Sequence, residues 1–223
     1  MADDFLQRYD PAAYPTVAVT VDLVLMSARA GALTVLLARR DAPPFEGRWA
    51  LPGGFVGPAE SLDEAARRVL AGKAHLEGAW IEQLYSFGDP GRDPRMRVIT
   101  VAYFALLPCE RLEAAVAGGE GLRLAHVGEE PLGLAFDHDG IVATAVQRLR
   151  GKLDYAPIAF SLLPERFTLR ALQDVHEAIL GQPLNKSAFR RKMIDSGWIR
   201  PTGERETGAS FRPAELFTFQ PPA

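Results

Sequence analysis

Arginines in two loops of this chain are suited to binding phosphate. The loops are interrupted by proline and glycine and hold Arg39, Arg40 and Arg48 in the first and Arg92, Arg95 and Arg97 in the second. Because a guanidinium can hold a phosphate through two parallel N–H bonds, we expect these arginines to contact an anionic ligand. The alternative is that Arg92 or Arg97 pairs with Asp89 or Asp93 and only stiffens its own loop.

Aromatic side chains near these loops could stack on a planar base in the same pocket. The candidates are Phe45, Trp49, Phe87 and Tyr103. Buried aromatic residues more often pack in a core, so both interpretations stay open. We expect the segment 49–57 to form the rim of the pocket. The histidines show no paired spacing typical of metal ligands, which favours surface or core positions for them.

The net charge of −3 is uneven along the chain. Residues 1–159 carry 16 Lys and Arg against 21 Asp and Glu, or −5, whereas residues 160–223 carry 9 against 7, or +2. The range 186–212 alone holds 7 bases against 3 acids, or +4. Such a patch suits either DNA phosphates or a solvated helix face. Its place on a recognisable element decides between the two.

The basic patch falls on a predicted helix-turn-helix followed by a hairpin. The expected elements are a helix at 169–180 capped by Thr168, a second helix at 186–196, and strands at 198–200 and 214–219 around a loop. In the second helix, Phe189, Met193 and Ile194 are expected to face inward. This order of elements is that of a winged helix-turn-helix.

The second helix of such a unit enters the major groove of DNA. We therefore expect DNA contacts from Asn185, Lys186, Ser187, Arg190, Arg191 and Lys192. Arg200, Arg205 and Arg212 surround the hairpin loop, where a wing touches the DNA backbone or the minor groove.

The part of the chain before residue 155 mixes strands and helices, which predicts the α/β class. The expected elements are a hairpin of strands at 17–26 and 33–39, a loop with a glycine-rich bend at 53–57, a helix ending near Lys73, strands at 80–87 and 98–107, and a helix at 138–153. Ser61 is a candidate N-cap for the first helix, with Glu64 in the capping-box position.

Length and composition bound the remaining possibilities. A chain of 223 residues with 48% hydrophobic residues fits one domain of about 150 residues plus a smaller one. The apolar run 16–26 contains Asp22 and is too short to cross a bilayer, and the first ten residues lack the features of a secretory signal. We expect a cytoplasmic protein in which the single cysteine, Cys109, is buried without a disulfide.

The segment Gly54–Leu76, with the skeleton Gly54-x5-Glu60-x7-Arg68-x-Leu70, resembles the Nudix box. The resemblance implies an α/β/α sandwich with a mixed sheet. In that family, carboxylates on the box helix hold a divalent metal against a pyrophosphate. This chain has Val69, Gly72 and Lys73 at those positions, so we expect no metal site and no catalytic residues.

Two further motifs, Arg92-Asp93-Pro94-Arg95 and Phe189-Arg190-Arg191-Lys192, extend the likeness over nearly the whole chain. Together with the degenerate box, they make it similar to the Nudix-related transcriptional regulators of NAD metabolism. That resemblance implies an effector-sensing domain over 1–155 and a winged helix-turn-helix over 160–223. It also implies ADP-ribose or a related nucleotide as effector, no cofactor, no membrane contact, and a dimeric repressor on a palindromic double-stranded DNA operator.

Two other functions are compatible with the sequence. The chain could be a Nudix hydrolase, such as an ADP-ribose pyrophosphatase, that uses Glu60, Asp63 and Glu64 as unorthodox carboxylates. It could also be an adaptor whose winged domain binds a partner protein instead of DNA.

Overall fold

Strand β1 (Ala18–Arg29) lies in the middle of the sheet, and its side chains are buried on both faces of that sheet. The computed structural model describes residues 8–29, 31–207 and 213–221. Within them, Leu23 and Leu25 belong to one core, whereas Val24 and Met26 belong to another. Because successive side chains of a strand point to opposite faces, both faces of the sheet must be covered by other elements.

The sheet around β1 is mixed and has seven strands. Their order is β3-β2-β1-β6-β5, with β4 paired to β1 and β7 paired to β2. β1 runs parallel to β6 and antiparallel to β2 and β4. The other strands are β2 (Ala32–Arg39), β3 (Trp49–Ala50), β4 (Gly53–Phe55), β5 (Glu82–Phe87), β6 (Val98–Leu106) and β7 (Leu122–His126).

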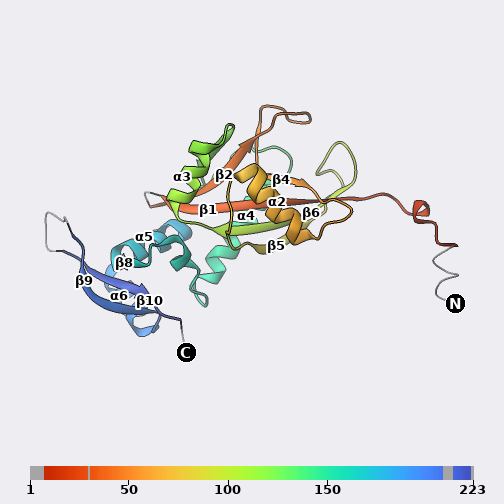
Figure 1. The fold of residues 1–223 in the computed structure, drawn as a ribbon. Coiled ribbons are helices and arrows are strands. Elements are labelled where there is room, and N and C mark those ends of the chain that lie inside the picture. Colours follow the sequence, from red (N-terminus) through yellow and green to blue (C-terminus); the bar gives the residue numbers. More distant parts are fainter. Residues whose placement is uncertain (1–7, 30, 208–212, 222–223) are drawn as a thin grey trace.

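Helices α2 (Leu62–Ala74) and α3 (Cys109–Gly118) cover one face of the sheet, and α4 (His138–Lys152) covers the other (Figure 1). This is the predicted α/β/α sandwich. The capping box of α2 is confirmed, since Ser61 Oγ accepts the Glu64 N–H at 3.3 Å and Glu64 accepts the Ser61 N–H at 2.7 Å. A short 3-10 helix, η1 (Pro11–Ala13), precedes the sheet. Within the described ranges, no helix has the length and apolar character needed to cross a membrane.

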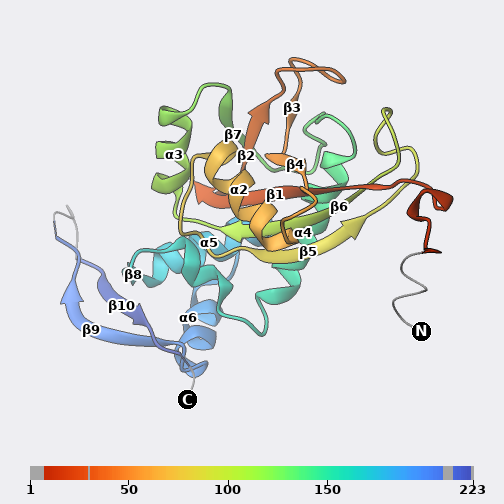
Figure 2. The ribbon, with the colours of Figure 1, turned by 45° about the vertical axis from the view of Figure 1, so that its right-hand side comes forward.

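The C-terminal unit is a winged helix, as predicted (Figure 2). Its elements are η2 (Ile158–Leu162), β8 (Arg166–Thr168), α5 (Leu169–Leu180), α6 (Lys186–Asp195), β9 (Ile199–Arg205) and β10 (Glu215–Phe219). The strands pair in the order β8-β10-β9. The predicted cap of α5 is present, because Thr168 Oγ1 accepts the Ala171 N–H at 3.0 Å. Gly181 ends the helix at φ 74°, a left-handed conformation that suits glycine.

One hydrophobic core joins the sandwich to the winged helix. It includes buried side chains from β1, α4, α5 and α6, among them Met26, Ile141, Ile179 and Phe189. Helix α5 contacts both β1 and β2, and Arg150 Nε on α4 donates to the Ile179 carbonyl at 3.0 Å. The winged helix is therefore packed against the sheet through α5.

Several local features differ from the sequence-based predictions. The patterns missed α3, β7 and β8. Ile194 is 49% exposed, so its predicted inward position is wrong, whereas Phe189 and Met193 are buried as expected. Cys109 is only partly buried. β9 extends to Arg205, five residues beyond its predicted end, because it pairs with β10 up to Glu215.

Replacing Ile179 with Ala should lower the free energy of unfolding by about 2–5 kcal/mol, because the removed atoms are fully buried and leave a cavity. The exposed Ile194 on the neighbouring helix is the matched control, and Ile194→Ala should change stability by less than about 0.5 kcal/mol. Urea denaturation followed by circular dichroism measures both variants. Equal losses in the two would contradict the assignment of the buried face.

Candidate functional site

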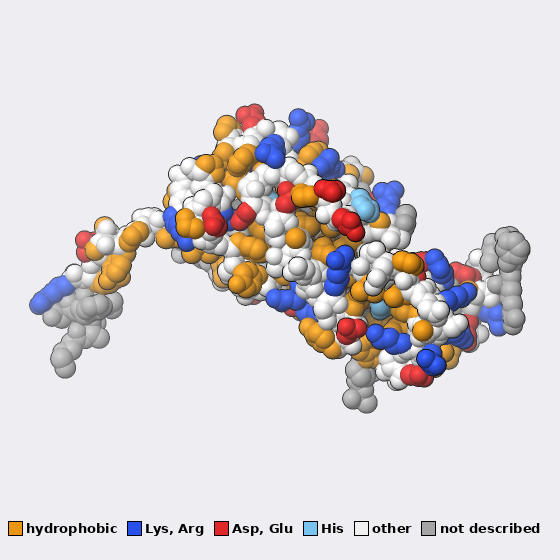
Figure 3. Space-filling view, turned by 180° about the vertical axis from the view of Figure 1, so that it is seen from behind, with side chains coloured by type: hydrophobic (Ala, Val, Ile, Leu, Met, Phe, Trp, Pro, Cys, Tyr) orange, Lys and Arg blue, Asp and Glu red, His pale blue; other side chains and the backbone are white. Residues whose placement is uncertain are grey.

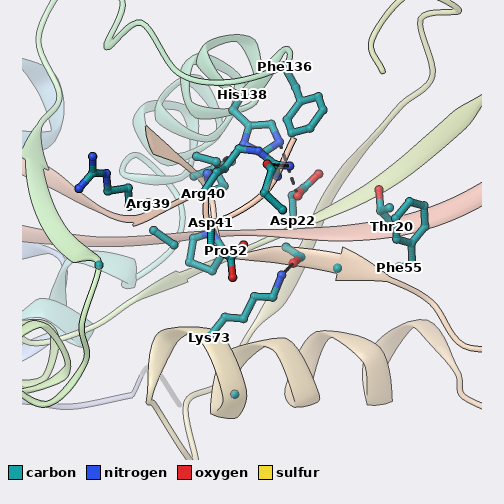
Figure 4. Close-up of a pocket in the computed structure, with 18 of the residues that line it drawn as sticks. Thr20, Asp22, Arg39, Arg40, Asp41, Pro52, Phe55, Lys73, Phe136 and His138 are labelled. Atoms are coloured by element: carbon teal, nitrogen blue, oxygen red, sulfur yellow. Dashed lines mark hydrogen bonds and ion pairs between the residues drawn. The ribbon is translucent and has the colours of Figure 1, made fainter. Parts of the chain in front are cut away.

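A cavity of about 420 Å³ opens between the end of α2, the bend of β3 and β4, and the segment that leads into α4 (Figure 4). Its wall includes Thr20, Asp22, Arg39, Arg40, Asp41, Leu51, Pro52, Gly53, Gly54, Phe55, Lys73, His75, Arg92, Asp93, Arg95, Glu120, Phe136 and His138. Part of the predicted rim, residues 50–55, lies in this wall. Cations, carboxylates and aromatic rings around one cavity suit a ligand that carries phosphates, hydroxyl groups and a planar base.

Asp22 in the cavity wall is a buried carboxylate, 5% exposed. Its Oδ2 accepts a hydrogen bond from Thr100 Oγ1 at 2.7 Å and lies 3.5 Å from Arg92 Nη2. Arg92 is also buried and binds Asp137 through two hydrogen bonds of 2.8 and 2.9 Å. A buried charge needs such partners. The network therefore joins β1, the loop before β6 and the start of α4.

His138 lies beside Asp22, with a hydrogen bond at one ring nitrogen and a carboxylate near the other. Its Nδ1 accepts the Leu51 N–H at 2.9 Å, and its Nε2 lies 3.6 Å from Asp22 Oδ1. The neutral ring therefore carries its proton on Nε2. Burial lowers the pKa of His138, although the carboxylates of Asp22 and Asp137 act in the opposite direction. The imidazole thus holds the bend at Leu51 in place and has no lone pair available to act as a base.

Arginine side chains surround the ring of Phe136 on the cavity wall. The guanidinium carbon of Arg40 lies 4.8 Å from the ring centroid, and that of Arg95 lies 5.8 Å from it. Burial lowers the pKa of Arg40, and the nearby charge of Arg95 lowers it further. Asp93 offsets part of this charge by binding Arg95 at 2.7 and 3.0 Å. A bound anion would relieve the remaining repulsion between the two arginines.

The face of α2 that points to the cavity offers no oxygen ligand for a metal. Val69 is 1% exposed and packs in the core. Gly72 has no side chain, and Lys73 Nζ donates to the Gly53 carbonyl at 2.6 Å. These side chains do not fit the divalent metal that the Nudix resemblance implies.

Glu60, the carboxylate of the box skeleton, is occupied by other groups. It accepts the Gly57 N–H at 2.6 Å and pairs with Arg68 at 2.5 Å. The hydrogen bonds from Arg68 and Gly57 lower the pKa of Glu60 to about 2. Within the described part of the chain, no group of three or more His, Cys, Asp or Glu residues is placed to hold a metal ion.

The structure brings together four of the nine predicted ligand contacts in the cavity wall: Arg39, Arg40, Arg92 and Arg95. The predicted alternative for Arg92 named the wrong partners, because Arg92 pairs with Asp137 and Asp22 instead of Asp89 or Asp93. Arg95 is the residue that pairs with Asp93.

The other five predicted contacts do not line this cavity. Arg48 donates to the carbonyls of Gly133 and Leu134, and Arg97 donates to the carbonyl of Gly88.

The three aromatic residues of that set have structural partners. Trp49 lies below the guanidinium of Arg123, at 4.3 Å from ring centroid to Cζ. Phe87 packs edge to face against Tyr85. Tyr103 lies in the core on the α2 side and donates to Asp63 at 2.7 Å, and burial followed by this hydrogen bond raises its pKa to about 12.

Sequence reasoning missed Asp22, Phe136 and His138 as members of the site. Asp22 carried a usable signal, since a charged residue inside a buried apolar strand requires a buried partner. Phe136 and His138 carried none, because their places depend on the loop between β7 and α4.

The candidate DNA-binding residues lie on the exposed side of α6 and on the hairpin. Lys186, Ser187, Arg190, Arg191, Lys192 and Arg200 are exposed, and Figure 3 shows Lys and Arg side chains over this part of the molecule. Asn185 caps α6 by accepting the Ala188 N–H at 3.0 Å. Lys192 lies 3.3 Å from Asp154, and Arg205 donates to the Pro213 carbonyl. Arg212 lies outside the described residues.

Comparison with known proteins identifies both parts of the chain. Residues 16–142 match the NUDIX domain, and residues 159–219 match the NrtR DNA-binding winged helix domain. The chain is 38% identical to the ADPR responsive transcriptional repressor NtrR of Acinetobacter baylyi over 218 residues, or 96% of this chain and 87% of that protein.

Two crystal structures of Shewanella oneidensis NrtR are similar to this structure. The complex with a 27mer DNA has a TM-score of 0.76 and 36% identity, and the match covers 91% of this chain and 93% of that chain. The NUDIX domain complexed with ADP ribose has a TM-score of 0.54 and 32% identity, and the match covers 67% of this chain and 99% of that chain.

Acidification should destabilise the protein through His138. Because burial lowers the pKa of the folded ring, the unfolded chain takes up a proton as the pH falls below about 6.5 while the folded chain resists it, and stability is lost. Melting temperatures should be measured at pH 7.5 and pH 5.5, which lie about one unit either side of the ordinary histidine pKa. Between these two pH values, the melting temperature of His138→Gln should fall less than that of the wild type. The exposed His126 supplies the control variant, His126→Gln, which should behave like the wild type. If His138→Gln loses as much stability as the wild type, this role is wrong.

Proposed function

We propose that this chain, which belongs to the NUDIX-related NrtR family, is a transcriptional repressor of NAD-metabolism genes. Its effector would be ADP-ribose. The sensing domain would span 1–155 and the DNA-binding domain 160–223. Two observations together carry the proposal. One is a cavity lined by arginines, in a chain whose described residues include no cluster of carboxylate, histidine or cysteine side chains able to hold a metal ion. The other is a winged helix with an exposed basic helix.

The cavity suits ADP-ribose in three respects. Arg39, Arg40 and Arg95 can bind its two phosphates through charge-assisted hydrogen bonds. Carboxylates in the wall, such as Asp41, can accept hydrogen bonds from ribose hydroxyls. Phe136 offers an aromatic face for the adenine ring.

The ligand would be bound and left intact. Hydrolysis in the Nudix family depends on a metal that activates water, and the carboxylates needed to hold that metal are replaced by Val69, Gly72 and Lys73. We therefore propose that the chain is not an enzyme and needs no cofactor. The hydrolase alternative would require Glu60 to give up its bonds to Arg68 and Gly57.

Helix α6 would enter the major groove. Phe189 and Met193 fix its inner side in the core, which directs Arg190 and Arg191 outward. We propose that a homodimer presents two such helices to a palindromic operator, because twofold symmetry in the protein matches twofold symmetry in the DNA. The regulator would act in the cytoplasm.

The contact between α5 and the sheet would transmit effector binding to DNA. The cavity network reaches the start of α4 through Arg92 and Asp137, and α4 reaches α5 through Arg150 and Ile179. A ligand shifts such an equilibrium only if it binds one arrangement more tightly than the other. ADP-ribose would therefore favour one relative placement of the two winged helices in the dimer.

Replacing Arg190 and Arg191 together with Ala should abolish operator binding, because both side chains lie exposed on the helix that would enter the groove. Fluorescence anisotropy on a duplex selected from random DNA by the purified protein measures this. Calorimetry should show unchanged ADP-ribose binding in the same variant.

The matched control replaces Arg29 and Arg67, two exposed arginines of the NUDIX domain, with Ala. It removes the same charge and should retain operator binding. Wild-type affinity for DNA should fall steeply as salt rises, and addition of ADP-ribose should change it. An affinity that responds to neither salt nor ADP-ribose would favour the adaptor alternative and refute this function.

A further inference from the structure

Lys73 occupies the cavity face of α2, one turn after Val69. Residues four apart on a helix lie on the same face, and here that face points to the bend of β4. A Cβ atom built on Gly54 would lie 3.2 Å from Val69, and Lys73 reaches Gly53. Figure 4 shows the Lys73 side chain extending from α2 towards the cavity. This is the face that would carry metal-binding carboxylates in a Nudix hydrolase.

The ammonium of Lys73 is held by one hydrogen bond and can still donate to a ligand. It donates to the Gly53 carbonyl at 2.6 Å, and an ammonium has three N–H donors. None of the ion pairs found among the described residues involves Lys73. The two remaining donors are thus available to a ligand in the cavity.

Gly53 provides a rigid anchor for this ammonium. It pairs with Asp22 in the register of β1 and β4, and a Cβ atom added to it would lie 2.0 Å from Asp22 Oδ1. The buried network of Asp22 and Arg92 fixes that position. The carbonyl that orients Lys73 therefore belongs to a residue whose position is fixed by strand pairing and by the close approach of Asp22.

A tethered ammonium can perform one of the two tasks of a divalent metal. It can neutralise and hydrogen-bond phosphate oxygens. It cannot bind a water molecule as a Lewis acid and lower its pKa, which is how a metal generates the attacking hydroxide. A pocket with an ammonium in place of the metal can therefore bind a diphosphate without hydrolysing it.

We infer that Lys73 takes the place of the divalent cation and holds the diphosphate of the effector, so that effector binding requires no divalent metal. This inference rests on the proposed function, because it takes ADP-ribose as the ligand. It assigns Lys73 as a residue that binds the diphosphate directly, in the same cavity wall as Arg40 and Arg95.

Calorimetry with ADP-ribose, in EDTA and in millimolar Mg²⁺, tests the inference on the full-length protein. The wild-type dissociation constant should be the same in both buffers. Lys73→Met should weaken binding about 10- to 100-fold in both, the range expected for loss of a charge-assisted hydrogen bond. Lys73→Glu should weaken it further, because a carboxylate repels the diphosphate.

Arg67→Met is the matched control, because Arg67 is an exposed cation on the same helix but not in the cavity wall. It should bind ADP-ribose like the wild type, and circular dichroism melts should show that all variants fold. Wild-type binding that requires Mg²⁺, or undiminished binding by Lys73→Met, would overturn the inference alone. Failure of the wild type to bind ADP-ribose in either buffer would overturn the proposed function as well.

Discussion

The buried carboxylate of Asp22 is the constraint on which the geometry of the pocket depends. Removing one partner of a buried ion pair typically costs about 3–5 kcal/mol, so Asp22 must keep Arg92 and Thr100 close to it. Those contacts fix the loop before β6 and the start of α4. They also leave room for only a glycine at residue 53, whose carbonyl holds Lys73. The charge of Asp22 thus holds the cavity wall in place without any contribution from a bound ligand.

The same architecture suits the proposed use of a hydrolase fold as a receptor. The loop and helix of the Nudix box keep their shape, because Glu60 and Arg68 bind each other and the backbone at Gly57 and Phe55. The positions that would hold a metal carry an apolar residue, a glycine and a cation. Under the proposed function, the pocket would keep cations for binding phosphate and would lack the metal that activates water in a hydrolase. Helices α4 and α5 share a core with the sheet, so the proposed coupling between ligand and winged helix has a packed route to follow.

Local sequence signals predicted the elements whose ends are set by nearby residues. The capping box at Ser61 and the cap and glycine that bound α5 fixed those helices correctly. The lining of the candidate cavity was predicted only in part, because its residues meet through long-range contacts. Arg39, Arg40, Arg92 and Arg95 were found from their loops, but the partner of Arg92 is Asp137, 45 residues away. Nothing local distinguishes Tyr103, which faces the other core, from Phe136, which faces the cavity.

Phosphorus NMR of ADP-ribose mixed with the protein and Mg²⁺ tests most directly whether the pocket is a receptor that leaves its ligand intact. A receptor of this kind should shift or broaden the pyrophosphate resonances, and those resonances should persist unchanged in total intensity over prolonged incubation. The appearance of phosphomonoester resonances from AMP and ribose phosphate, in proportion to the amount of protein, would contradict it.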